Sequence, residues 1–233
     1  MEKVLIGTPT YDEDKHFFEE YFKALQDQKI KYDLIVADNS RNDNYAKLLQ
    51  QKGILVVRIK TGADKYERVF DSRKAIINYF LQGEYTHLFW VDSDVVLPKD
   101  ALKKLLAENK DIISGVYVSP FNYPRLPTIV HPVAYKLTHS EELRLPLQSS
   151  EIKQGEIKEM HSVGFGCCLI KREVLEKVPL RRIPETTSTE DILFCVDARK
   201  KGYKTFLHAG VLCKHGLKHQ GRIEYIEAMR YIH

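Results

Sequence analysis

The chain has 233 residues, of which 43% are hydrophobic and 29% charged, a composition typical of soluble globular proteins. This length permits one large domain or two small ones, and the composition excludes disordered, collagen-like and silk-like chains. Lys and Arg number 36 against 32 Asp and Glu, and the net charge of +4 is too small to indicate nucleic acid as the main partner.

The four cysteines, at positions 167, 168, 195 and 213, form neither a zinc-type Cys-x-x-Cys pair nor the framework of a secreted disulfide protein. We therefore expect reduced thiols and a cytoplasmic protein. No apolar stretch reaches the roughly 18 residues that span a bilayer. The first residues are too short and acidic for a signal peptide, so we expect the mature chain to begin at Met1.

Through residue 118, short β-branched and aromatic runs alternate with segments of helical period, which predicts a mostly parallel sheet with crossover helices on both faces. The expected strands are Val4–Thr8, Asp33–Ala37, Ile54–Ile59, His87–Val91 and Ile112–Val118. The expected helices lie near 14–28, 42–51, 68–82 and 99–108. Ligands of such sheets bind beyond the carboxyl ends of the strands, which directs attention to Thr8–Tyr11, Asp38–Ser40 and Asp92–Asp94.

The second half has a different pattern. Thr128–Leu137 and Ser162–Lys171 are expected to be strands, and the polar stretch Thr138–Glu159 between them a surface loop or flap. The elements expected after them are the helices Arg172–Val178 and Glu190–Lys201, the strand Lys204–Leu212 and a terminal helix from Arg222. No repeat or linker divides the chain, so we expect one domain over residues 1–233.

Asp92-Ser93-Asp94 is the first candidate for chemistry. Two carboxylates two residues apart in extended chain point the same way and can bind a divalent ion that holds a diphosphate. The bare pattern is common, and Asp12-Glu13-Asp14 repeats it at an expected helix start, where capping explains it. Asp92 and Asp94 instead lie between apolar runs, where carboxylates are costly without a cation or donors. Metal binding is favoured there over a structural turn.

Two later segments each allow two interpretations. Thr189-Glu190-Asp191 stands at a helix start, where Asp191 fits a helix cap and a general base about equally well. His215 follows the last expected strand, where a lone histidine is more often a loop residue than a metal ligand. His219 would share an ion with it only in a helix, which the nearby glycines disfavour.

Three further motifs are weaker on their own. Thr8-Pro9-Thr10-Tyr11 and Asp38-Asn39-Ser40 are placed to hydrogen-bond a base or ribose, yet such residues are turn formers first. Arg73 and Lys74 are expected in a helix near its start and could meet phosphate. Neither a P-loop nor a Gly-x-Gly-x-x-Gly motif occurs, which argues against kinases, P-loop ATPases and dinucleotide oxidoreductases.

Taken in order over residues 3–216, these motifs resemble the GT-A fold glycosyltransferases, in particular those of family 2. The resemblance rests on segments that match the family in order and spacing: Thr8–Tyr11, Val36–Ser40, Arg73–Asn78, Phe89–Asp94, Gly164–Arg172, Thr189–Thr205 and His215. It implies a GT-A type Rossmann-like sheet with a nucleotide-binding half, residues 1–118, and a smaller acceptor-side half, residues 119–233.

The resemblance also implies a function. A sugar would pass from a nucleoside diphosphate sugar, UDP- or GDP-linked, to a hydroxyl of a sugar, protein or lipid-linked acceptor, with inversion and with Asp191 as general base. Mn²⁺ or Mg²⁺ would be held by Asp92, Asp94 and His215. The donor-binding set would be Thr8, Pro9, Tyr11, Asp38, Arg73, Asp92 and Ser93.

Two departures from the family pattern bear on specificity. Ala37 replaces the first Asp of the nucleotide motif, and Thr138–Glu159 has no counterpart. The alternatives are a sugar nucleotidyltransferase, which would need a Gly- and Lys-rich phosphate loop after the first strand, and a nucleotide- or carbohydrate-binding module without catalysis. Peripheral membrane contact through Ile223, Ile226 and Met229 stays open, although packing of that segment on the domain is favoured.

Overall fold

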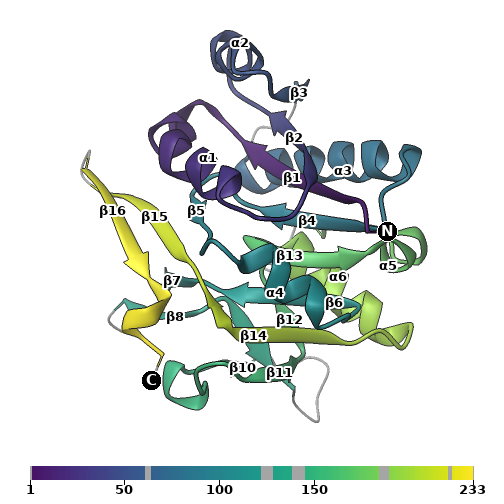
Figure 1. Cartoon of the computed structure of the whole chain (residues 1–233), viewed down its shortest axis with the longest axis vertical. Coiled ribbons are helices and arrows are strands. Elements are labelled where there is room, and N and C mark those ends of the chain that lie inside the picture. The colour runs from purple at the N-terminus through teal and green to yellow at the C-terminus, as the bar shows by residue number, and fades with distance from the viewer. Residues whose placement is uncertain are drawn as a thin grey trace.

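The computed structural model describes residues 2–60, 64–121, 128–137, 145–183, 189–219 and 222–232. An eight-stranded sheet runs through it in the order β11-β14-β6-β13-β4-β1-β2-β3 (Figure 1). Its strands, in chain order, are β1 (Val4–Thr10), β2 (Tyr32–Asp38), β3 (Leu55–Arg58), β4 (His87–Val91), β6 (Ile112–Val116), β11 (Ile157–Met160), β13 (Cys167–Lys171) and β14 (Thr205–Leu212). Strands β13 and β11 run antiparallel to their neighbours and the other pairs are parallel. The expected mostly parallel sheet is confirmed.

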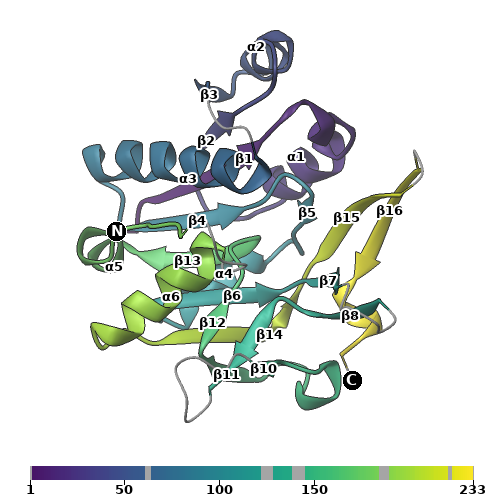
Figure 2. The same ribbon diagram turned by 180° about the vertical axis from the view of Figure 1, so that it is seen from behind.

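Helices cover both faces of this sheet (Figures 1 and 2). One face carries α1 (Phe18–Gln26) and α4 (Ala101–Ala107), and the other carries α3 (Lys65–Gln82) and α6 (Glu190–Lys200). The short helix α5 (Arg172–Lys177) follows β13, and α2 (Asn44–Gln51) packs beside the edge strand β3.

The strand β4 shows why helices cover both faces of the sheet. All of its side chains are buried, and they alternate between two hydrophobic cores. Leu88 and Trp90 belong to the core that includes residues of α3 and α6. Phe89 and Val91 belong to the core that includes residues of α1 and α4.

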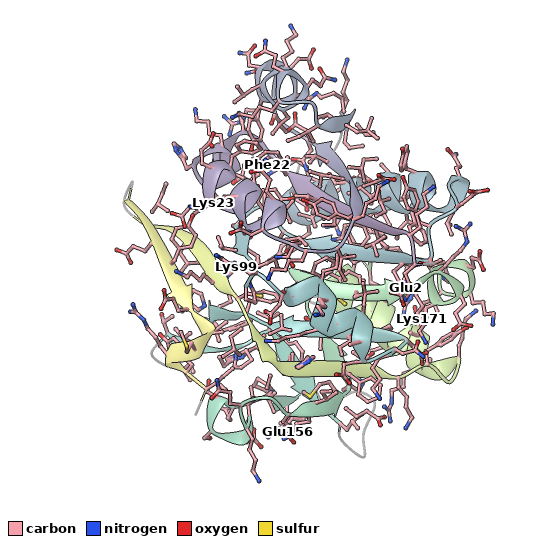
Figure 3. The ribbon with its side chains drawn as sticks, viewed as in Figure 1. Glu2, Phe22, Lys23, Lys99, Glu156 and Lys171 are labelled. Carbon is pink, nitrogen blue, oxygen red and sulfur yellow. The ribbon has the colours of Figure 1, made fainter. Side chains whose placement is uncertain are left out.

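Three small sheets complete the fold. The first, β16-β15-β5, consists of β5 (Val95–Val96), β15 (Lys214–His219) and β16 (Arg222–Glu227), and Figure 1 shows the β15–β16 hairpin projecting from the main sheet. The second contains β9 (Ala134–Lys136), β10 (Leu145–Pro146) and β12 (Ser162–Val163), and the third pairs β7 (Val118–Phe121) with β8 (Ile129–Pro132). Exposed side chains such as Glu2, Lys23 and Lys99 can be followed in Figure 3.

The expected strands and helices of the first half are found, with two changes. The expected helix near 14–28 is a 3₁₀ turn, Asp12–His16, followed by α1. The expected strand Ile112–Val118 leaves the main sheet after Val116 and restarts as β7. Tyr117 lies at this break, where its carbonyl accepts a hydrogen bond from Val133 N at 3.1 Å.

The second half needs more correction. The helices from Arg172 and Glu190 and the strand β14 end within one residue of expectation. The stretch Thr138–Glu159 is not a loop throughout: residues 138–144 lie outside the described ranges, but a 3₁₀ turn follows at Ser149–Glu151 and β11 pairs with β14 at the edge of the main sheet. The apolar residues Ile157 and Met160 of β11 pack against the two hydrophobic cores. The sequence analysis missed this strand because the stretch as a whole is polar.

The two long strands expected in this half are each broken in two. Thr128–Leu137 forms β8 and β9, which belong to different sheets. Ser162–Lys171 forms β12 and β13, separated at Gly164–Phe165–Gly166.

The expected terminal helix from Arg222 is wrong. This segment is the strand β16, followed by a 3₁₀ turn at Ala228–Arg230. Pairing with β15 provides the backbone hydrogen bonds of β16, and it places Tyr225 opposite Gly216 and in edge contact with Phe17, with ring centroids 6.1 Å apart. None of the helices in the described ranges has the length and apolar content that crossing a bilayer requires.

Candidate active site

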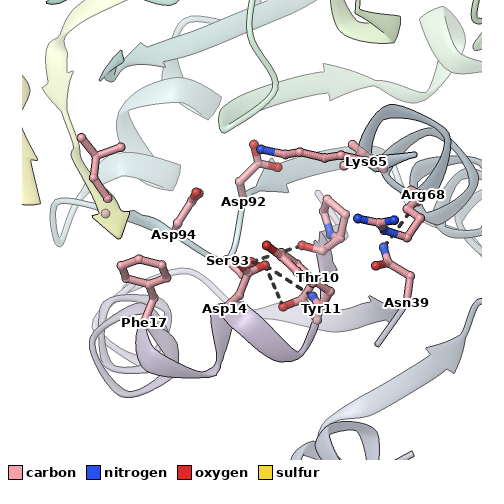
Figure 4. Close-up of a pocket in the computed structure, with 14 residues that line it drawn as sticks. Thr10, Tyr11, Asp14, Phe17, Asn39, Lys65, Arg68, Asp92, Ser93 and Asp94 are labelled. Carbon is pink, nitrogen blue, oxygen red and sulfur yellow. Dashed lines mark hydrogen bonds between the residues drawn. The ribbon is translucent and has the colours of Figure 1, made fainter. Parts of the chain in front are cut away.

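A pocket of about 300 Å³ lies at the carboxyl ends of β1, β2 and β4 (Figure 4). Its lining comes from the loops after these strands, the first turns of α3 and the strand β15. A second hollow of about 570 Å³ adjoins it and shares Tyr11, Asn39 and Arg68. This is the edge of the sheet where a parallel α/β fold is expected to bind its ligand.

Asp92, Ser93 and Asp94 form a tight turn between β4 and β5, and all three line the pocket. Val95 N donates to the carbonyl of Asp92 at 3.0 Å, which closes the turn, and Asp92 N donates to Gly166 O at 3.2 Å. Main-chain bonds therefore hold the turn and leave its two carboxylates available to the pocket.

Asp94 faces His215, which β15 brings beside the turn by pairing with Val95. His215 Nε2 lies 3.5 Å from Asp94 Oδ2, and Nδ1 lies 2.9 Å from the carbonyl of Val118. Burial alone would raise the pKa of Asp94, but the neighbouring imidazole outweighs it and the pKa is lowered. Burial opposes the charged form of His215, yet Asp94 raises its pKa on balance.

Asp92 is paired on its other side with Arg73 of α3, the residue expected near ribose or phosphate. Arg73 is only 3% exposed and does not line the pocket. Its Nη2 donates to Asp92 Oδ1 at 3.0 Å, and its Nη1 lies 2.9 Å from Glu190 Oε1. The guanidinium also lies 5.7 Å from the Trp90 ring and 5.2 Å from the Phe165 ring. Arg73 thus connects the Asp92 turn to the start of α6.

Glu190 and Asp191 occupy the first turn of α6, and both are buried. Burial raises the pKa of Glu190 to about 7, although Arg73 opposes that rise. Burial likewise raises the pKa of Asp92 against Arg73. Asp191 Oδ1 accepts hydrogen bonds from Ile192 N at 2.7 Å and from the hydroxyl of Thr189, so the side chain is fixed in orientation. Asp191 does not line the pocket itself.

The last residues of β1 and Tyr11, which follows them, contribute unevenly to the pocket. Pro9 and Tyr11, both expected in the donor-binding set, line it, and so does Thr10. Thr8 does not, because it is buried and its hydroxyl is hydrogen-bonded to the hydroxyl of Tyr21. Burial, followed by the carboxylate of Asp14, raises the pKa of Tyr11 to about 12, so its hydroxyl stays protonated.

Asp38 lies behind the pocket wall rather than on it. The residue is fully buried, and its carboxylate is bound by Arg58 Nη1 and by the hydroxyl and backbone N–H of Ser40. Asn39, the next residue, lines both hollows, and its amide donates to Ser72 Oγ at 2.9 Å. Asn39 is therefore the residue by which this loop lines the first pocket, whereas Ser40, Arg41, Asn42 and Asp43 line only the second hollow.

Three charged residues of the pocket lining escaped the sequence reasoning. Asp14 Oδ2 accepts a hydrogen bond from Ser93 Oγ at 2.7 Å, so this carboxylate, interpreted as a helix cap, also lines the pocket. Burial, then repulsion from Asp94, raises its pKa to about 7. Lys65 and Arg68 also line the pocket, although α3 was expected to begin only at residue 68. Nothing in the acidic segment Asp12–Asp14 itself indicates that Asp14 contacts the Asp92 turn.

Tyr117 is a buried aromatic residue that the sequence reasoning also missed. Its ring lies edge-on to His215 with centroids 5.6 Å apart, and its hydroxyl accepts from Gly166 N at 3.3 Å. A Cβ at Gly164 would lie 2.0 Å from that hydroxyl, and one at Gly166 2.7 Å from the ring carbon that bears it. The Gly164-Phe165-Gly166 segment is therefore glycine-rich because Tyr117 occupies the space of two side chains.

The donor set at the turn fits a divalent cation that also has ligands from a bound molecule. Within the described ranges, no group of three or more His, Cys, Asp or Glu side chains is arranged to hold a metal unaided. Asp94 could offer an oxygen, and His215 could offer Nε2, because its Nδ1 donates to a backbone carbonyl as ligand histidines commonly do. Mg²⁺ is typically held by one or two carboxylates together with substrate phosphates.

The sequence profile of glycosyl transferase family 2 matches residues 5–179. The chain belongs to glycosyl transferase family 2. The match includes the loops after β1 and β2, the helix α3 and the Asp92 turn, and it ends before Asp191 and His215. No curated protein sequence matches the chain.

Solved structures similar to this chain include A197 from STIV, with 18% identity, a TM-score of 0.52 and coverage of 93% of this chain and 86% of that one. S. aureus TarS 1-349 in complex with UDP-GlcNAc has 17% identity, a TM-score of 0.53 and coverage of 89% and 55%. The mannosyltransferase PcManGT from Pyrobaculum calidifontis, in complex with GDP-Man and Mn²⁺, has 15% identity, a TM-score of 0.50 and coverage of 88% and 56%. The chain thus spans little more than half of the latter two, and the likeness shows the GT-A fold.

Proposed function

We propose that this glycosyltransferase moves a sugar from a nucleoside diphosphate sugar to a hydroxyl acceptor, with a divalent metal at the Asp92 turn and inversion at the anomeric carbon. The observation that carries the proposal is the pocket at the carboxyl ends of β1, β2 and β4, which Asp94 lines with His215 directly behind it. The nucleotide sugars in the TarS and PcManGT complexes, and the Mn²⁺ in the latter, support it.

Asp94 and His215, with Asp92, would hold Mn²⁺ or Mg²⁺ at the mouth of the turn. The ion would supply positive charge to the diphosphate, whose negative charge grows as the sugar leaves. Ser93 orients the turn through its bond to Asp14. Tyr11, Pro9 and Asn39 would contact the nucleoside. Thr8 and Asp38 lie behind the pocket wall, where they would hold the end of β1 and the loop after β2 in shape.

Asp191 would act as the general base. Its Oδ1 is occupied by Ile192 N–H and the Thr189 hydroxyl, which leaves Oδ2 for a proton. A carboxylate at a helix N-terminus is stabilised in its ionised form. The acceptor hydroxyl would give its proton to Oδ2 while its oxygen bonds to the anomeric carbon. The bond from that carbon to the diphosphate oxygen breaks, and its electron pair stays on the oxygen.

The two halves of the chain would then have separate tasks within one domain. Residues 1–118 contribute most of the pocket lining. Residues 119–233 add Gly216 and Leu217 to that lining and carry the proposed base Asp191 and the proposed ligand His215. The acceptor is a sugar, protein or lipid-linked hydroxyl compound. A cytoplasmic location with peripheral membrane contact would suit a lipid-linked one, and Ile223 and Met229 are exposed on the second half, as such contact requires.

Asp191→Asn tests the proposed base. We expect the turnover number for sugar transfer to fall by about 10²–10⁴-fold, since the carboxylate that accepts the proton is lost. Binding of the nucleoside diphosphate should change little, because Asp191 does not line the pocket. Transfer is measured with UDP- and GDP-sugars, and the anomeric configuration of the product is read by NMR. Equal losses of transfer and donor binding would contradict the assignment, and a retained configuration would contradict inversion.

A further inference from the structure

Helix α3 presents two cations to the pocket, Lys65 and Arg68, three residues apart in its first turns. Lys65 is exposed and Arg68 partly so. Figure 4 shows Lys65 extending from α3 toward Asp92, and Arg68 beside Asn39 and Tyr11. The two side chains therefore follow the pocket from the Asp92 turn to the loops after β1 and β2.

Neither cation is used by the part of the fold that the structure describes. Among the described residues, neither side chain forms an ion pair or hydrogen bond, and Arg68 makes only a distant approach to the Tyr11 ring, at 6.0 Å. Lys65 acts on Asp94 only through space. Arg58, at the neighbouring hollow, is the opposite case, since Asp38, Asp43 and the Ser40 carbonyl bind its guanidinium.

The opposite charges on the pocket walls restrict what can bind. Asp14, Asp92 and Asp94 repel an anion unless a metal ion or nearby cations compensate them. A simple cation would be repelled by Lys65 and Arg68. A ligand that fits both walls binds a metal ion at the carboxylates through some of its oxygens and presents other anionic oxygens to α3. A diphosphate is such a ligand.

We propose that Lys65 and Arg68 bind the diphosphate of the donor from the α3 side of the pocket, while the Asp92 turn holds its metal ion. This assignment rests on the proposed function, which it deepens. As the sugar departs, the diphosphate gains one negative charge, and the two cations stabilise it. They therefore contribute both to donor binding and to departure of the leaving group.

Inorganic pyrophosphate with Mg²⁺ tests the site without a nucleoside or sugar. Calorimetric titration of the full chain should show binding that Lys65→Met/Arg68→Met weakens at least about tenfold, because each lost contact is a charge-assisted hydrogen bond. The matched control is Lys47→Met/Lys103→Met, which removes the same net charge from exposed positions on α2 and α4 away from the pocket. It should change the affinity by less than about twofold, since exposed charges at a distance are screened.

A charge-keeping variant separates the role of the cations from a change in helix shape. Lys65→Arg/Arg68→Lys should bind pyrophosphate within about threefold of wild type, because cations remain on the same turn. The proposal is overturned if wild type binds no pyrophosphate, or if the Met pair binds within about twofold of wild type. If pyrophosphate binding depends on the two cations while no nucleotide sugar is consumed, the proposed function fails and the diphosphate site stands.

Discussion

Helix α3 carries two kinds of positive charge within three turns. Arg73 is 3% exposed, with Asp92 and Glu190 on either side and the Trp90 and Phe165 rings nearby. Lys65 is exposed, and no ion pair holds it among the described residues. A buried charge with partners fixes the elements that supply those partners, whereas an open charge without partners is free to meet a ligand.

The buried charge and the open charges also differ in what they contribute to folding stability. Desolvating a guanidinium is costly, and the arrangement persists only because carboxylates repay that cost. Arg73 therefore holds the Asp92 turn and the start of α6 in one position, which sets where Asp191 lies relative to the Asp92 turn. Lys65 and Arg68 retain much of their hydration and contribute little to folding.

The largest expected effect is that of Arg73→Met. Removing one partner of a buried ion pair leaves Asp92 and Glu190 uncompensated, and we expect the free energy of unfolding to fall by about 3–5 kcal/mol. Urea denaturation measures it. Arg199→Met is the control, because that side chain is 42% exposed and lies 3.8 Å from its carboxylate partner. Its cost should stay below about 1 kcal/mol. Equal losses of unfolding free energy in Arg73→Met and Arg199→Met would contradict the distinction between buried and exposed charges.

A second, smaller effect is expected from pH. The folded pKa of Glu190, about 7, lies above its ordinary value of 4.5 because of burial. The folded state binds this proton more tightly, so the free energy of unfolding should decline as pH rises from roughly 4.5 to 7. Glu190→Gln should flatten that decline by roughly 1–3 kcal/mol across the window.

Unfolding midpoints at several pH values provide the measurement for Glu190. Glu19→Gln is the control, since that side chain is 81% exposed and should leave the slope of wild type unchanged. Asp14 contributes a slope of the same sign in every variant, so the difference from wild type isolates Glu190. A Glu190→Gln profile parallel to that of wild type would show that the pKa of this carboxyl is the same in the folded and unfolded states, which contradicts a pKa raised by burial.

The smallest expected effect on the free energy of unfolding is that of substituting the open charges Lys65 and Arg68. Lys65→Met and Arg68→Met should each change the free energy of unfolding by no more than about 0.5 kcal/mol, as surface substitutions without partners usually do. The same urea experiment measures it, with wild type as reference. A loss of 2 kcal/mol or more in either variant would mean that the fold uses the cation and would weaken its assignment to ligand binding.

Much of the first half of the fold could be predicted from the sequence because its signals are local. Strand β4 is a continuous apolar run ended by Asp92, and the position of that turn at the sheet edge follows from the α/β pattern. His215 was predicted as a ligand only through the resemblance. The structure places it beside Asp94 through the pairing of β15 with β5.

The rest depends on contacts between distant parts of the chain. Arg73 was expected at the donor, but its pairing with Glu190, far along the chain, could not be inferred from spacing. Asp14 looks like an ordinary helix cap until Ser93 is packed against it. Strand β16 was mistaken for a helix because apolar spacing is ambiguous in a short segment and does not show that this segment pairs with β15.

Binding of a nucleoside diphosphate at the Asp92 turn is tested most directly by calorimetric titration of wild type and Asp94→Ala with UDP and GDP, each with and without Mn²⁺. We expect one nucleotide to bind wild type only with Mn²⁺ and to lose that binding in Asp94→Ala, because Asp94 faces both the pocket and His215. Binding that is independent of Mn²⁺ and unchanged in Asp94→Ala, or no binding of either nucleotide, would contradict a metal-bound donor at this turn.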